Sequence, residues 1–292
     1  MGLAERIKEI ENSYFCYPPK EWKIYPFLNE NNSGYLPMFN LVGKSLLTVG
    51  SSFDHAINAS LTGCRDITIV DICPLTKEFK DLKLASFLEL EREEYVRFIH
   101  TLIGDYETNP EFLSAQIFAK VRDRLQNISL DSYQLWDYYV HNYNLAEKLL
   151  IFMENDGVSR SRLFEISPYL INDESYQQAR DAIEETNINI IIGDIRKVNF
   201  ARKYDVMWFS NVLDYIGETD VQALFQKAEE ALNPNGQMLF KYYFYHRLVK
   251  NPDSVIQIKG YNLDLKEIPS VRLLTGEEEH KDKIALYQKK IG

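Results

Sequence analysis

The sequence has few cysteines and no long apolar run. The cysteines number three, an odd count with no C-x-x-C pair, so we predict neither a disulfide framework nor a zinc site. Free thiols favour a reducing compartment, and we expect a cytoplasmic protein. No apolar stretch approaches the ~18 residues of a membrane span. Residues 1–13 are charged and lack the apolar centre of a signal peptide, so stable membrane insertion is not expected.

Basic residues are fewer than acidic residues. With 33 Lys and Arg against 43 Asp and Glu, the formal net charge is −10. Nucleic acids and anionic membranes need a basic face, so neither is expected as a partner. The 19 Tyr and 16 Phe favour instead a deep pocket for an organic ligand. The sequence gives no indication of the number of subunits.

The most informative segment spans residues 45–74. Two short apolar runs, Leu46–Val49 and Ile67–Val70, are typical of buried strands in a parallel sheet. A Gly50-Ser51-Ser52 turn and a helix-length segment, Phe53–Leu61, lie between them. Asp71 follows the second strand, 21 residues after Gly50. A small-residue turn and an acidic residue at about that distance (~20 residues) hold a nucleoside in dinucleotide-type folds.

The turn lacks two glycines of the dinucleotide fingerprint. G-x-G-x-x-G would place glycines where Ser52 and His55 stand. Three glycines suit a pyrophosphate, whereas one glycine flanked by serines suits a smaller acidic group, such as an amino-acid carboxylate at a helix N-terminus. A nucleoside plus an amino acid describes S-adenosyl-L-methionine (SAM) better than NAD. An ordinary α/β crossover with an exposed Asp71, and an NAD-dependent oxidoreductase, remain alternatives.

Later segments extend the same pattern. Apolar strands are expected at Asn189–Ile192, Asp205–Phe209 and Met238–Tyr245, with a helix over Glu218–Leu232. The order predicts an α/β, Rossmann-like class I SAM-dependent methyltransferase fold with a mostly parallel seven-stranded sheet. Loops at the carboxyl edge of such a sheet bind ligands. We therefore expect a cofactor site formed by Gly50, Ser51, Ser52, Asp71, Ile72, Asp194, Ile195, Ser210 and Asn211, with Asp194 beside the adenine and Ser210-Asn211 beneath the sulfur.

Three motifs resemble a known family. Val70-Asp71-Ile72-Cys73-Pro74 is followed by Leu82-Lys83-Leu84-Ala85, and Ser210-Asn211-Val212-Leu213-Asp214-Tyr215 comes later, with a Trp136-Asp137 pair between them. These are similar to stretches of the betaine-lipid-synthase-type SAM:diacylglycerol 3-amino-3-carboxypropyltransferases (the DUF3419 group). The resemblance runs from about residue 45 to about residue 245. It departs at Cys73, where the group has Asn, at Tyr215, where it has Trp, and at the Gly50 turn, where it has Ser-Gly-Gly.

The resemblance implies transfer of the 3-amino-3-carboxypropyl group of SAM to a small-molecule or lipid-like alcohol or amine. Methyl transfer to a small molecule is the first alternative, and a non-catalytic SAM-binding module is the second. Asp214 is the first candidate for a general base, although it could instead cap the following helix. Tyr215 could stack on the substrate or simply pack. His55, His141 and Lys241 are weaker candidates for base or anion-binding roles.

Three regions are expected along the chain. Residues 1–42 would form an N-terminal helix and an aromatic strap, either packed on the sheet or closing over the cofactor. Residues 43–74 and 187–292 would form the SAM-binding core, ending in a hairpin of Val255–Gly260 and Lys283–Gln288. Residues 75–186 are longer than one crossover helix requires. Their helical spacing predicts a helical insertion between the second and third strands that forms the acceptor-side subdomain.

Overall fold

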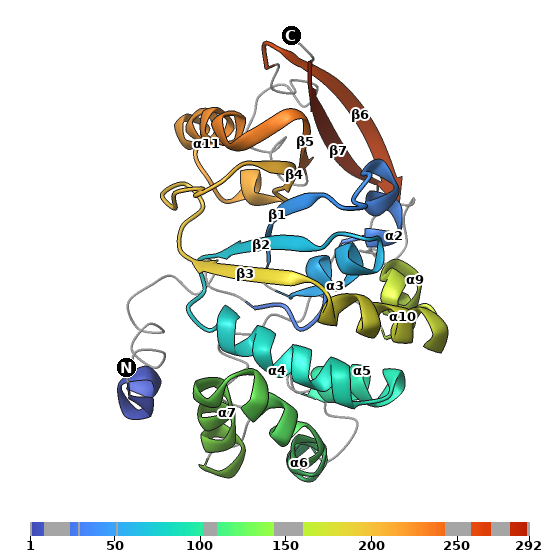
Figure 1. The fold of residues 1–292 in the computed structure, drawn as a ribbon, viewed down its shortest axis with the longest axis vertical. Coiled ribbons are helices and arrows are strands. Elements are labelled where there is room, and N and C mark those ends of the chain that lie inside the picture. Colours follow the sequence, from blue (N-terminus) through green and yellow to red (C-terminus); the bar gives the residue numbers. More distant parts are fainter. Residues whose placement is uncertain are drawn as a thin grey trace.

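A seven-stranded sheet forms the centre of the protein, seen here in a computed structural model (Figure 1). The structure describes residues 2–8, 24–28, 30–50, 52–101, 110–142, 160–242, 258–269 and 281–290. The strand order is β3-β2-β1-β4-β5-β7-β6. β1 to β5 pair in parallel, and β7 is antiparallel to both of its neighbours. This order is that of the class I SAM-dependent methyltransferase fold, which confirms the predicted fold class.

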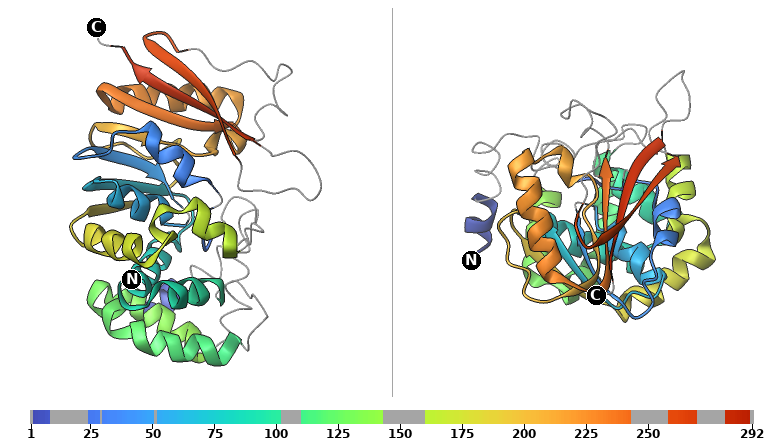
Figure 2. Two further views of the ribbon diagram at one scale, coloured as in Figure 1. Left: turned by 90° about the vertical axis from the view of Figure 1, so that its right-hand side faces the viewer. Right: turned by 90° about the horizontal axis from the view of Figure 1, so that it is seen from above.

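The first four strands along the chain lie close to their predicted positions. Their bounds are β1 (Ser45–Val49), β2 (Asp66–Asp71), β3 (Asn187–Ile192), β4 (Tyr204–Trp208), β5 (Leu232–Tyr242), β6 (Tyr261–Pro269) and β7 (Lys281–Lys289). Successive side chains point to opposite faces. Leu46 therefore packs in one apolar cluster and Leu47 in the other. Seen from above in Figure 2, α11 (Glu218–Ala231) lies on one side of the sheet and α10 (Asp173–Glu184) on the other.

The described residues between β2 and β3 are mainly helical. Its helices are α4 (Thr76–Glu89), α5 (Arg92–Thr101), α6 (Pro110–Ile128), α7 (Leu130–Asn142), α9 (Arg160–Ile166), the short η2 (Pro168–Leu170) and α10. α4 to α7 gather beyond β3, at the end of the molecule opposite the β6–β7 hairpin (Figure 1). Helical spacing of apolar residues continues from residue 78 to residue 99, but this stretch forms two helices, because Leu90 is extended and ends α4. The division into three regions stays a prediction.

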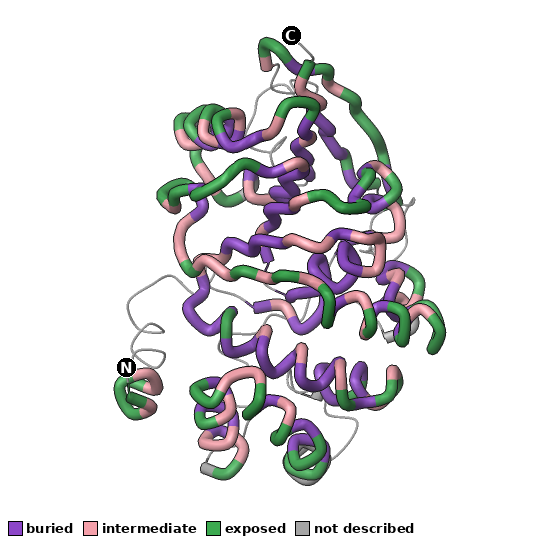
Figure 3. Tube along the Cα trace, in the orientation of Figure 1, coloured by how far each residue is buried: buried purple, intermediate pink, exposed green. Residues whose placement is uncertain are grey.

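The predicted terminal hairpin was wrong in its first strand. Of the predicted Val255–Gly260, residues 255–257 lie outside the described residues and residues 259–260 form a turn, so β6 begins only at Tyr261. β6 is an edge strand whose side chains are mostly exposed (Figure 3), so its sequence lacks the apolar alternation that marks a half-buried strand. The second strand, β7, contains the predicted Lys283–Gln288. None of the helices described here has the length and apolar character of a membrane span.

The N-terminal segment is attached to the sheet by a buried ion pair. Asp54 opens α3 (Asp54–Leu61), and its Oδ1 lies 2.8 Å from Nζ of Lys83 on α4. Both side chains are fully buried. Lys83 also donates to the carbonyls of Pro26 and Ser52, and Asp54 Oδ2 accepts from the backbone N–H of Leu28 at 2.6 Å. One pair thus joins α3, α4, the Gly50 turn and the segment preceding the sheet.

This pair gives a stability prediction. Lys83→Met would leave the Asp54 carboxylate buried without its cation, and breaking a buried pair in this way costs about 3–5 kcal/mol of unfolding free energy. Urea denaturation measures the loss. Lys77→Met is the matched control on the same helix, because Lys77 is half exposed and its partner Asp81 keeps a second cation, Lys80 Nζ, at 2.6 Å. The effect of this substitution should stay within about 0.5 kcal/mol. Equal losses of unfolding free energy in the two variants would contradict the structural role given to the Asp54–Lys83 pair.

Candidate functional site

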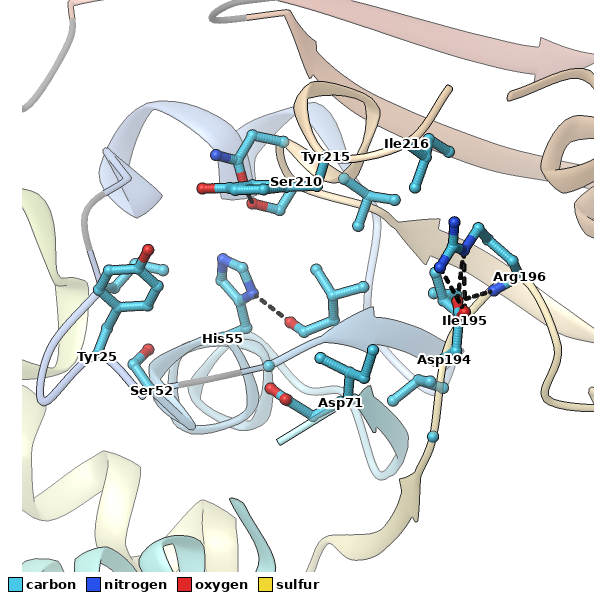
Figure 4. A pocket seen from close by; sticks show the side chains of 18 residues that line it. Tyr25, Ser52, His55, Asp71, Asp194, Ile195, Arg196, Ser210, Tyr215 and Ile216 are labelled. Carbon is cyan, nitrogen blue, oxygen red and sulfur yellow. Dashed lines mark hydrogen bonds and ion pairs between the residues drawn. The ribbon is translucent and has the colours of Figure 1, made fainter. Parts of the chain in front are cut away.

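A cavity of about 1140 Å³, the solvent at its open mouth included, lies at the carboxyl edge of the sheet (Figure 4). Parallel strands end at the same edge, so the loops after β1, β2, β3 and β4 meet there. The predicted site residues that line it are Gly50, Ser52, Asp71, Ile72, Asp194, Ile195, Ser210, Asn211 and Tyr215. Ser51 lies outside the described residues, and of Asp214 only the backbone is described, in η3 (Val212–Asp214).

The Gly50 turn is shaped by packing beneath it. A Cβ on Gly50 would lie 2.7 Å from Cγ2 of Ile69, closer than side-chain atoms approach one another, so this position favours glycine. Phe53 follows with a left-handed backbone, φ +68°, and α3 begins one residue later than predicted. The Ser52 carbonyl accepts from Lys83 Nζ at 2.6 Å. The contact with Ile69 and the hydrogen bond from Lys83 therefore hold the turn in place, and its residues Gly50 and Ser52 line the cavity.

Asp71 faces the cavity from the end of β2. Its Oδ1 accepts the backbone N–H of Cys73 at 2.8 Å. Burial raises the pKa of Asp71 to about 7, and hydrogen bonds from the Cys73 backbone, the Thr76 side chain and the Ile72 backbone offset only part of the effect. Asp71 also lines the cavity, where its carboxylate oxygens can accept further hydrogen bonds. Two ribose hydroxyls would supply donors at this position, so the residue fits the nucleoside that the sequence predicted.

Asp194 is engaged by a residue that sequence reasoning did not identify. The backbone N–H and Nε of Arg196 donate to its Oδ1 at 3.0 and 2.8 Å, and Nε and Nη2 donate to its Oδ2 at 3.0 and 2.7 Å. These bonds lower the pKa of Asp194. Arg196 also lines the cavity and pairs with Asp220 at 3.0 Å. An adenine amino group would have to displace Arg196 to reach the carboxylate oxygens of Asp194.

Behind His55 and Ser210, which line the cavity, lies a buried carboxylate, Glu30, that the sequence did not reveal. Its Oε2 lies 3.1 Å from Nε2 of His55, and its Oε1 accepts from Oγ of Ser210. Burial opposes the ionisation of Glu30. This effect is outweighed by the hydrogen bond from His55, the positive charges of Lys241 and His55, and the hydrogen bond from the Ser210 hydroxyl. The pKa of Glu30 is therefore held below its ordinary value.

His55, His141 and Lys241, the weaker candidates, are each in contact with other groups of the protein. His55 Nδ1 lies 3.1 Å from the Val49 carbonyl, so both ring nitrogens of His55 face protein acceptors. His141 is exposed on α7 and does not line this cavity. Lys241 is buried and pairs with Asp282 at 3.1 Å, and so neither binds an anion at the surface nor points to solvent.

Two other expectations can be compared with the geometry. Gly217, rather than Asp214, occupies the N-cap position of α11, so the helix-capping alternative for Asp214 was wrong. The described residues between 75 and 186 do not line the cavity, whereas Tyr25 and Leu28 of the N-terminal segment do. An acceptor-binding role for the helical insertion stays a prediction.

Comparison with known proteins agrees with this fold. A family model described as a methyltransferase domain matches residues 150–240, which include β3, β4 and most of β5 but not the Gly50 turn or Asp71. A search of curated proteins found no match. The strand order and the matched domain together support a SAM-dependent transferase. Membership in the betaine-lipid-synthase-type family stays a prediction.

Solved structures with some similarity are also methyltransferases. The glycopeptide N-methyltransferase MtfA, complexed with S-adenosyl-L-homocysteine, is 10% identical with a TM-score of 0.42, covering 91% of this chain and 92% of that one. A methyltransferase from Pyrococcus furiosus is 12% identical with a TM-score of 0.38, covering 88% and 80%. A TehB-like SAM-dependent methyltransferase from Corynebacterium glutamicum is 10% identical with a TM-score of 0.38, covering 98% and 96%. Similarity this low adds nothing to the strand order.

The raised pKa of Asp71 gives a prediction on pH. Ribose hydroxyls donate to the ionised carboxylate, so binding requires Asp71 to lose its proton. With a pKa of about 7, the ionised fraction rises about ten-fold between pH 6 and pH 8, and SAM affinity should rise by a similar factor. Calorimetric titration of SAM at these pH values measures it. Asp71→Asn should remove the part of the pH dependence that Asp71 causes; an unchanged profile would contradict the assignment.

Proposed function

We propose that this protein is a SAM-dependent transferase acting on a small molecule, with methyl as the transferred group. The observation that carries the proposal is the convergence of the Gly50 turn, Asp71 and the Ser210-Asn211 pair on one cavity. These elements are far apart in sequence, and each stands where this fold needs a different part of the cofactor to be bound. The family model that matches part of the chain favours methyl over the larger group.

The described residues divide between the parts of the cofactor. Asp71 would accept hydrogen bonds from the ribose hydroxyls. The backbone at Gly50 and the N-terminus of α3 would receive the amino-acid carboxylate. Ile72 and Ile195 offer apolar surface to the adenine, with the guanidinium of Arg196 beside them. Arginine guanidinium planes stack on aromatic rings, so Arg196 is better placed to cover the adenine than Asp194 is to accept from its amino group.

The acceptor would enter from the other end of the cavity. Tyr25 lies there, across the cavity from Ile195 and Arg196 (Figure 4). Leu28, Val212, Tyr215 and Ile216 add further lining that is mainly apolar. Bound SAM supplies a sulfonium carbon open to in-line displacement, so the protein needs chiefly to align the acceptor and exclude water. An uncharged or lipid-like alcohol or amine fits these residues. Tyr215, half exposed at the cavity, would contact it, and Asp214 stays the candidate base.

A second candidate is transfer of the 3-amino-3-carboxypropyl group. One observation favours it: residues that carry the family resemblance take part in building the site. Asp71 lines the cavity, and Lys83 holds the Ser52 carbonyl at the Gly50 turn. In this reaction the γ-carbon of the amino-acid arm, rather than the methyl, would face the acceptor. A binding module without turnover would use the same cofactor contacts.

The by-product distinguishes these candidates. The protein is incubated with SAM and a fractionated extract, and the adenosyl products are separated by chromatography. Methyl transfer leaves S-adenosylhomocysteine, and aminocarboxypropyl transfer leaves methylthioadenosine. We expect S-adenosylhomocysteine. Methylthioadenosine would replace the first proposal with the second, and thermal stabilisation by SAM with neither product would indicate the binding module.

Cofactor placement can be tested by substitution. Asp71→Ala removes an ionised acceptor of two hydrogen bonds, each contributing roughly 1.5–3 kcal/mol. SAM affinity, measured by calorimetry, should fall at least about ten-fold. Asp66→Ala is the control, because Asp66 begins the same strand and pairs with Arg202 away from the cavity. Parent-like affinity in Asp71→Ala would show that the nucleoside does not lie at this position.

A further inference from the structure

Ser210 has a backbone conformation that costs energy for a serine. It stands two residues after the end of β4, directly after Phe209, and its φ is +52°. Glycine adopts this region freely, whereas residues with a Cβ are strained there. Its carbonyl accepts the backbone N–H of Lys241 at 2.7 Å, a bond that glycine would make equally well. The backbone therefore favours glycine at this position, and the use of serine has to be explained by its hydroxyl.

The hydroxyl of Ser210 has its proton committed to Glu30. An ionised carboxylate only accepts, so the proton of this hydrogen bond comes from Ser210 Oγ. Asn211 Oδ1 lies farther away, at 3.3 Å from the same oxygen. A hydroxyl with its single proton engaged offers its lone pairs to other groups. Because Ser210 lines the cavity, a ligand that reaches its Oγ would meet a hydrogen-bond acceptor.

The charges around Glu30 support this orientation. Its pKa is lowered, so it is ionised over the physiological range. Lys241, whose positive charge helps to lower the pKa of Glu30, forms an ion pair with Asp282, and Asp282 also accepts a hydrogen bond from Tyr35. The cavity side of this cluster is the Ser210 oxygen. A hydroxyl that donates to a carboxylate becomes a stronger acceptor, because the two hydrogen bonds polarise each other.

We propose that Ser210, oriented by Glu30, is the specificity-determining residue for the positively charged end of the cofactor. This inference rests on the proposed function. SAM has two positive charges, the sulfonium and the α-ammonium, and both favour an acceptor oxygen backed by a buried anion. Methyl transfer converts the sulfonium to a neutral thioether. The α-ammonium is common to the substrate and product forms, so a contact to the sulfonium makes the site bind the substrate form in preference to the product, whereas a contact to the ammonium favours both over ligands that lack it.

Ser210→Gly tests the proposal, since it removes the hydroxyl while relieving the backbone strain. Calorimetry measures the affinities of SAM, S-adenosylhomocysteine and methylthioadenosine, which is a neutral thioether without the ammonium. We expect SAM affinity to fall about ten-fold, as for loss of a hydrogen bond to a charged group, and methylthioadenosine affinity to stay unchanged. An unchanged S-adenosylhomocysteine affinity assigns the contact to the sulfonium, and a parallel fall assigns it to the ammonium.

Two further variants keep the result interpretable. Glu30→Gln should lower SAM affinity in the same selective way, because an amide can donate to Ser210 and reverse the hydroxyl. Ser86→Ala removes another buried serine hydroxyl, bonded to the Leu82 carbonyl on α4, and should leave all three affinities unchanged. Equal weakening of all three ligands in Ser210→Gly would overturn this inference alone. A wild-type protein that binds none of them would overturn the proposed function and this inference with it.

Discussion

The site depends on the buried pair of Asp54 and Lys83. Two fully buried charges cost several kcal/mol each to desolvate, and their attraction offsets that cost only when the remaining lone pairs and protons are also bonded. Here they are. Lys83 donates to the carbonyls of Pro26 and Ser52, and Asp54 accepts from Leu28 N–H and from Tyr169 Oη. The pair has one satisfactory geometry, and the Gly50 turn is held in place by it.

Glu30 acts in the same way at the other end of the cavity. It links the N-terminal segment to α3 through His55 and to the end of β4 through Ser210. Lys241, Asp282 and Tyr35 continue the network to β5 and β7. Apolar packing is tolerant of small shifts, whereas hydrogen bonds to buried charges are not, since an unpaired buried charge is expensive. The cavity is therefore largely organised before any ligand arrives.

Local patterns in the sequence predicted the sheet and most of the cavity. The apolar runs of β1, β2 and β4 are short and continuous, as buried parallel strands require, and the rule that loops meet at the carboxyl edge then brought Asp71 and Ser210 together. Glu30 could not be found this way. It lies 25 residues from His55 and 180 from Ser210, in a segment without regular periodicity. Its burial depends on tertiary contacts that no local pattern encodes, and the same holds for Lys241.

The two buried carboxylates also explain where the backbone is strained. Three described residues other than glycine have positive φ. Phe53 and Ser210 lie at the ligand edge of the sheet, whereas the third, Asn235, is exposed in β5 and belongs to a residue type that tolerates this conformation. Such residues persist only where their surroundings determine them. Asp54, next to Phe53, is fixed by Lys83, and Ser210 is fixed by Glu30. Each strained residue is thus adjacent to a buried charge that holds it. The buried hydrogen bonds and ion pairs stabilise the strained loops that face the cavity. Because the same bonds hold the N-terminal segment, its stability is coupled to the geometry of the site.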